Sequence, residues 1–153
     1  MRDSFHVKEM SEFIDNAEAL EAKIKSIPEC AGVAVIVDRQ KDISNEIEIA
    51  VAGTTGASID ILWLGGVPFD LNADANLTCR YRVSVRTTPI LRQPTQIKAD
   101  MLCKHLVKEL WQWDSTDEDD SCSEVWSVLD VDLVPDEQHL VYQIILEVKT
   151  EIL

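Results

Sequence analysis

Hydrophobic residues recur at intervals of three and four in the first part of the chain, which predicts an amphipathic helix. The apolar stripe consists of Val7, Met10, Ile14, Ala17, Leu20, Ile24 and Ile27. Acidic residues between them come mostly early, while Lys23 and Lys25 come late, which is the order that the helix dipole favours. Because Pro28 cannot continue a helix, we expect the element to span about residues 8–27.

The middle of the chain carries strand patterns. Residues 32–37 are nearly all aliphatic, which is typical of a strand buried on both faces. Residues 46–51 (Glu-Ile-Glu-Ile-Ala-Val) alternate polar and apolar and predict a half-buried strand. A further strand is expected at 59–64, before a pair of glycines. Proline, asparagine and aspartate in residues 67–76 then predict a loop.

The clearest strand pattern covers residues 79–87. One face would carry Cys79, Tyr81, Val83 and Val85, and the other face Arg80, Arg82, Ser84 and Arg86. A second helix is predicted from about Thr95, a plausible N-cap, to Trp113. Its apolar stripe is Ile97, Met101, Leu102, His105, Leu106, Leu110 and Trp113.

Two final strands are predicted at 125–134 and 140–149, and the short connection between them indicates an antiparallel hairpin. The predicted order is therefore α-β-β-β-β-α-β-β. We expect residues 1–153 to form a single α+β domain, in which a mostly antiparallel sheet of five to six strands packs against two long helices on one side.

Charge narrows the possible functions. The 153 residues include 28 acidic and 14 basic side chains, which gives a net charge of −14. This balance argues against a protein that binds nucleic acid by neutralising phosphates, and against docking on anionic membranes. The first fifteen residues are charged throughout, so we expect no secretory signal there.

Residues with catalytic or metal-binding chemistry are sparse. The four cysteines, at Cys30, Cys79, Cys103 and Cys122, form no CxxC pair, and we expect them to be reduced thiols. Cys30, Cys79 and Cys103 fall on apolar faces and are expected to pack as small hydrophobes. The three histidines, at His6, His105 and His139, are far apart and suggest neither a triad nor a metal pair. Glycine-rich phosphate loops are absent from the sequence. We therefore expect no enzyme, no cofactor and no metal site.

An acidic segment at 114–124 is expected to be a solvated loop. Its carboxylates are Asp114, Asp117, Glu118, Asp119, Asp120 and Glu124. They cluster at 117–120 without the glycine of an EF-hand, so a weak cation site is a minor alternative. A functional negative surface is the other alternative.

The arginine stripe of the strand at 79–87 is unusual in so acidic a chain. Cross-strand pairing is the first explanation, with Glu46 and Glu48, Asp130 and Asp132, or Glu147 as partners. A docking surface for an acidic patch of a neighbouring copy is the second. We expect an internal partner for Arg82, and an intersubunit partner for at least one of Arg80, Arg86 and Arg92.

The order of these elements resembles the tail-terminator and minor tail proteins of tailed bacteriophages. The similar features are the first helix, the aliphatic strand Ile61-Leu-Trp-Leu-Gly-Gly66, the alternating strand Tyr81-Arg-Val-Ser-Val-Arg86, a helix closing on Leu110 to Trp113, an irregular loop and a terminal strand pair. The resemblance covers most of the chain as a pattern of elements, without an invariant motif. Residues 41–58 have no counterpart in it.

This resemblance implies a structural virion protein of the tail or neck, assembled in the host cytoplasm. Such proteins form a hexameric ring on the tail tube, stop its growth and face a neck or head-completion protein, while double-stranded DNA passes through the lumen. An acidic lumen, supplied by residues such as those at 114–124, would avoid holding that DNA. Alternatives are another head–tail joining or tail-completion protein, an acidic inhibitor that mimics DNA, and an unrecognised small enzyme.

Overall fold

The computed structural model describes residues 12–39, 41–70, 75–88, 96–115, 125–134, 136 and 138–152. In chain order the elements are α2 (Glu12–Ser26), the short 3₁₀ helix η1 (Pro28–Cys30), β1 (Ala34–Val37), α3 (Ser44–Val51), β2 (Ala57–Asp70), β3 (Ala75–Thr87), α4 (Ala99–Leu110), β4 (Ser127–Val134) and β5 (Leu140–Ile152).

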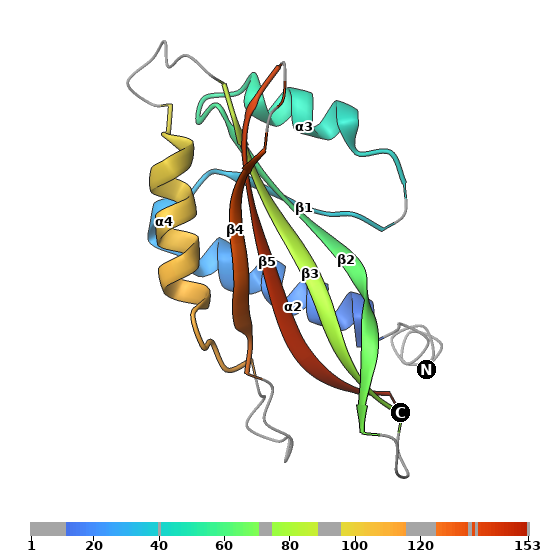
Figure 1. The fold of residues 1–153 in the computed structure, drawn as a ribbon. Coiled ribbons are helices and arrows are strands. Elements are labelled where there is room, and N and C mark those ends of the chain that lie inside the picture. Colours follow the sequence, from blue (N-terminus) through green and yellow to red (C-terminus); the bar gives the residue numbers. More distant parts are fainter. Residues whose placement is uncertain are drawn as a thin grey trace, which may run out of the picture.

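The fold is α+β, with a five-stranded mixed sheet in the order β1-β2-β3-β5-β4 (Figure 1). β1 runs parallel to β2, and the other three pairings are antiparallel. The terminal hairpin predicted from the sequence is confirmed as β4 and β5. The long central strands place residues directly opposite one another, so that Tyr81 of β3 lies between Trp63 and Leu146.

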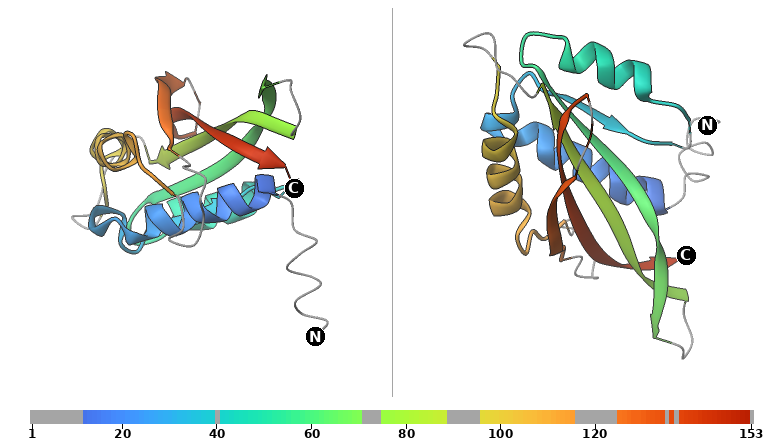
Figure 2. Two further views of the ribbon diagram at one scale, coloured as in Figure 1. Left: turned by 90° about the horizontal axis from the view of Figure 1, so that it is seen from below. Right: turned by 45° about the horizontal axis from the view of Figure 1, so that its top comes forward.

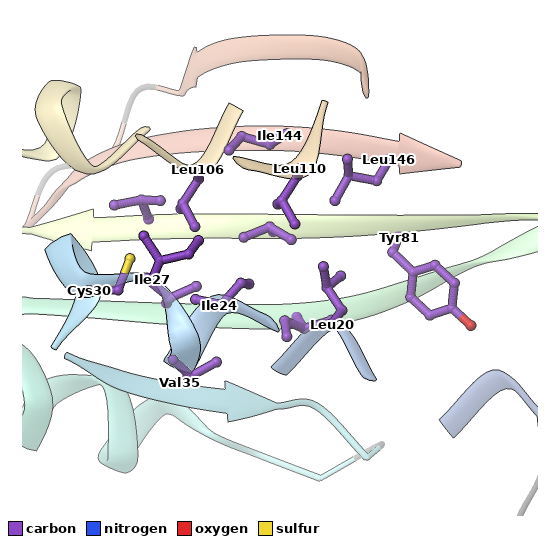
Figure 3. Packing of buried hydrophobic residues seen from close by; sticks show 14 of the residues in the cluster. Leu20, Ile24, Ile27, Cys30, Val35, Tyr81, Leu106, Leu110, Ile144 and Leu146 are labelled. Carbon is purple, nitrogen blue, oxygen red and sulfur yellow. The ribbon is translucent and has the colours of Figure 1, made fainter. Parts of the chain in front are cut away.

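One face of the sheet forms the main core. Its alternating side chains are fully buried because α2 and α4 cover them (Figures 2 and 3). Leu20 and Ile24 come from α2, and Leu106 and Leu110 come from α4. These residues belong to the two stripes predicted from the sequence. Both predicted helices are therefore present, although α4 is shorter than the predicted 95–113.

Aromatic rings close one end of this core. Trp126 is completely buried, and its ring centroid lies 5.6 Å from that of Trp113 and 5.4 Å from that of Tyr81. Its Nε1 donates a hydrogen bond to Ser115 Oγ at 2.9 Å, so the buried indole N–H is satisfied. Trp126 therefore joins the chain after α4 to the start of β4.

The prediction of a strand at 46–51 is wrong, because these residues form α3. Ile43, Ile47 and Val51 are four residues apart, so on a helix they face one way. They pack as a small separate core against Ile36 of β1. Asp42 Oδ1 accepts hydrogen bonds from Ser44 N and Oγ at the start of the helix. Residues 46–51 fit both the two-residue period of a strand and the 3.6-residue period of a helix. Burial of Ile43, Ile47 and Val51 against Ile36 selects the helix.

The position of α3 also corrects the expectation that all helices lie on one side of the sheet. Ile36 lies between Val35 and Val37, which belong to the main core. Since successive side chains on a strand point to opposite faces, α3 covers the face opposite α2 and α4. Both faces of the sheet thus carry a helix.

The loop predicted at 67–76 is also shorter than expected. β2 continues to Asp70 and β3 begins at Ala75. The register shifts between Trp63 and Gly65, and Gly65 adopts a φ of +112°, a conformation that side-chain-bearing residues rarely adopt. The glycines therefore form an irregularity within a long strand instead of ending it.

β1 confirms the predicted strand at 32–37, but it lies at an edge of the sheet. Val35 and Val37 are buried, while Ala34 is exposed. The start of the first predicted helix, with Val7 and Met10, lies outside the described residues, as does Thr95.

Candidate functional site

The arginine stripe lies on the face of the sheet that α3 covers in part. Arg86 Nε donates to Asp60 Oδ1 at 2.9 Å, and the Asp60 side chain is only 4% exposed. Burial raises the pKa of the Asp60 carboxyl, although the positive charge and hydrogen bond of Arg86 act in the opposite direction. The pair is thus part of the sheet, with little contact with solvent.

Two serines surround this ion pair. Ser58 lies opposite Arg86 and Ser84 opposite Asp60, and both side chains are fully buried. Neither serine hydroxyl forms a hydrogen bond within the described residues. The centre of this face is therefore polar and buried, which the sequence pattern alone did not indicate.

Arg80 has a partner in the same chain. Its Nε lies 3.4 Å from Glu147 Oε2, directly opposite on β5, and Glu147 was one of the partners expected from the sequence. The Arg80 side chain is 54% exposed, so this ion pair contributes little to stability.

Arg82 differs from its two neighbours. It lies between Leu62 and Ile145, and it forms no ion pair with any described residue. Its Nε is buried without a hydrogen-bond partner. Its positive charge nevertheless acts on Asp60, where it joins that of Arg86 in opposing the burial that raises the pKa of the Asp60 carboxyl. Arg82 thus interacts with Asp60 through its charge, whereas Arg80 and Arg86 form ion pairs within the chain.

The other expected partners of the stripe lie elsewhere. Glu46 is exposed on α3, and Glu48 Oε1 lies 3.1 Å from His139 Nε2, which ties α3 to the start of β5. Asp130 and Asp132 lie side by side on β4. The hydrogen bond and negative charge of Asp130 raise the pKa of Asp132.

Most of the acidic segment lies outside the described residues, together with Arg92: the residues concerned are Asp117, Glu118, Asp119, Asp120 and Glu124. Asp114 forms an isolated antiparallel bridge with Val125. Among the described residues no group of three or more histidine, cysteine or acidic side chains could hold a metal ion.

Three cysteines, Cys30, Cys79 and Cys103, are buried free thiols in the core, as the sequence predicted. Burial, with a smaller contribution from the negative charge of Glu29, raises the pKa of Cys30 to about 11. His105, expected on the apolar stripe of α4, is partly exposed, and its Nδ1 lies 3.8 Å from Glu29 Oε1.

An open apolar groove of about 680 Å³ lies between α4 and the edge of the sheet. It is lined by Asp100, Cys103, Lys104, Val107, Lys108, Trp111, Val131 and Tyr142. Trp111 is 60% exposed, and the lysines are exposed on α4. We refer to this feature as the α4–β4 groove. The sequence offered one signal for it, a tryptophan beside lysines on the exposed side of the second helix.

Exposed apolar side chains continue from the groove along β4, which is an edge strand of the sheet. Leu129, Val131 and Leu133 are 46%, 41% and 58% exposed. Contiguous apolar surface with a polar rim marks interaction sites, and an edge strand offers unpaired backbone groups. The groove and β4 together are therefore the best-defined candidate site in the described part of the chain.

No protein-family model matches the chain, and no curated protein matches it. Within the described residues, no helix is both long enough and apolar enough to cross a membrane.

Proposed function

We propose that this protein is a structural assembly protein of a phage virion that caps the tail tube as a ring, stops tube growth and joins the tail to the neck. It acts without catalytic turnover. Its partners are further copies of itself in a cyclic homo-hexamer, the tail tube protein and a neck or head-completion protein.

The observation that carries this proposal is the apolar surface formed by the α4–β4 groove and β4. Trp111 and Leu133 are large side chains left in water, and an isolated folded chain gains nothing from exposing them together. Burial against other protein chains would remove this cost. An assembly protein needs such a surface. The order of elements, which resembles that of tail terminators, is the reason for proposing assembly on a tail tube.

Charge is compatible with a ring through which DNA passes. With a net charge of −14, a lumen lined by carboxylates would repel the phosphate backbone and leave DNA free to move. Double-stranded DNA would then pass through the lumen without being bound specifically.

The test is electron microscopy of phage particles produced without this gene. We expect tails of uncontrolled length, or tails that fail to join heads, while the tube protein still polymerises. Complementation with the wild-type gene should restore tails of uniform length on heads.

Two results would count against the proposal. Normal tails attached to normal heads would eliminate a role in termination and joining. Unattached tails of uniform, normal length would remove the capping activity and leave a head–tail joining protein instead.

A further inference from the structure

The exposed face of α3 is chemically complementary to the α4–β4 groove. Ile49 is 66% exposed, the highest value among the exposed large hydrophobic side chains of the described residues. Glu46 precedes it by three residues and lies on the same face of the helix. Asp42 comes four residues earlier, before the helix begins, and its Oδ1 accepts the hydrogen bonds of Ser44 N and Oγ. Residues 42–49 therefore carry two acids followed by an apolar side chain, and Glu46 and Ile49 lie on one face of α3.

Two lysines that line the groove carry the opposite charge at the same spacing, beside the acidic Asp100, which also lines it. Lys104 and Lys108 are four residues apart on α4, and Trp111 follows three residues later. Neither lysine forms an ion pair with a described residue, and the same holds for Glu46.

We propose that α3 of one copy of this protein docks into the α4–β4 groove of a second copy. In a parallel alignment of the two helices, Asp42 faces Lys104, Glu46 faces Lys108, and Ile49 packs on the Trp111 ring. Ile49 loses its exposure to water, and the charges at the rim of the groove are neutralised.

Ile49 and Trp111 are both exposed in the single chain, so a chain does not fill its own groove with α3. α3 covers β1 and β2, whereas the groove adjoins β4 at the other end of the strand order (Figure 1). Contact between two different surfaces is head-to-tail, and it generates a ring when the rotation between copies closes. The inference deepens the proposed function and rests on it for the number of copies in the ring.

Photocrosslinking of the full-length purified chain tests this contact directly. p-Benzoylphenylalanine is placed at position 49 in one sample and at position 67 in a control sample. Val67 is 60% exposed, similar to Ile49, but it lies near the far end of β2. From position 49 we expect intermolecular crosslinks to peptides that contain Trp111, Val131 or Leu133. Crosslinks to other surfaces, or none at a protein concentration of about 1 mM, would overturn the proposal.

Charge exchange tests the alignment. Glu46→Lys and Lys108→Glu should each weaken self-association about tenfold in sedimentation velocity, because each replaces an attraction by a repulsion. The double variant Glu46→Lys/Lys108→Glu should restore most of it. Lys25→Glu, at an exposed helix position, changes the net charge as much as Lys108→Glu and should have little effect. Failure of the double variant to recover would overturn the alignment.

The outcomes separate this inference from the proposed function. If the Glu46→Lys and Lys108→Glu variants self-associate as strongly as the wild type, the α3–groove contact is excluded. Tail length in the gene-deletion experiment would still test capping. A confirmed contact together with normal tails on heads would keep the interface and remove the proposed function.

Discussion

Arg86 and Asp60 form a diagonal ion pair across β2 and β3. Asp60 lies directly opposite Ser84, two residues before Arg86, and the Nε–Oδ1 distance is 2.9 Å. The Arg86 side chain is 19% exposed and that of Asp60 4% exposed. A charged stripe that looks like a surface in the sequence is thus, at this position, part of the interior pairing of the sheet.

Removing one partner of this pair should destabilise the protein. Arg86→Met leaves the buried Asp60 carboxylate without its countercharge, which should lower the free energy of unfolding by about 3 kcal/mol in urea denaturation. The double variant Asp60→Leu/Arg86→Met should recover most of this loss, because neither charge remains. Equal stability of the single variant and the wild type would show that the pair is solvated.

The pKa values of Asp60 and Asp136 should be shifted in opposite directions, because one carboxyl is buried and the other accepts backbone hydrogen bonds. Asp60 should lose its proton above 3.8 because of burial, whereas Asp136 should do so below it because the backbone N–H groups of Gln138 and His139 bind its carboxylate. Asp60 therefore disfavours folding above its raised pKa, and this cost diminishes as the pH falls through it. Carboxyl chemical shifts measured by NMR against pH check both directions, and Asp60 titrating below Asp136 would contradict the burial.

Trp126 should matter far more than Trp111 for the stability of the chain. Trp126→Phe removes a buried indole and its hydrogen bond to Ser115, so we expect a loss of about 2 kcal/mol. Trp111→Phe, at a residue that is 60% exposed, should change stability by less than about 0.5 kcal/mol. Thermal denaturation at low protein concentration compares the two, and similar melting temperatures would contradict the assigned burial.

The helical assignment of residues 44–51 makes Ile47 and Ile49 unequal. Ile47 is buried against Ile36, so Ile47→Ala should cost about 2 kcal/mol. Ile49→Ala should leave the stability of the monomer within about 0.5 kcal/mol. In a strand with strict alternation both isoleucines would share one buried face, and both variants would then be destabilised alike. Urea denaturation of the two variants distinguishes helix from strand.

Cys30 should resist alkylation in the folded protein. With a pKa of about 11, its reactive thiolate form is scarce at pH 8, and its side chain is buried as well. Labelling with iodoacetamide, followed by peptide mass spectrometry, should show slow modification at pH 8 that accelerates towards pH 10, and rapid modification in urea. Rapid labelling of the native protein at pH 8 would contradict this environment.

The candidate site was only partly visible in the sequence. The pairing of Arg80 with Glu147 was among the expected alternatives, because alternation places charged residues of neighbouring strands on one face. Asp60 is not recognisable from the sequence as the partner of Arg86, because it stands within an aliphatic strand. The α4–β4 groove was not predicted at all, because it depends on where a helix stops covering the sheet.

The sequence by itself determined the elements whose periodicity is long and unambiguous. The stripes of α2 and α4, the alternation of β3 and the terminal hairpin all follow from spacings of 3.6 or 2 residues and from turn residues. These patterns also determined the α+β class.

Only the tertiary structure decided the rest. Residues 46–51 satisfy both periods, and contact of Ile43, Ile47 and Val51 with Ile36 selects the helix. Whether a glycine pair ends a strand depends on the neighbouring strand, and β3 pairs with β2 beyond Gly66. The physical reason is common to these cases: short segments gain too little from their own propensity, so burial against residues distant in the chain determines their conformation.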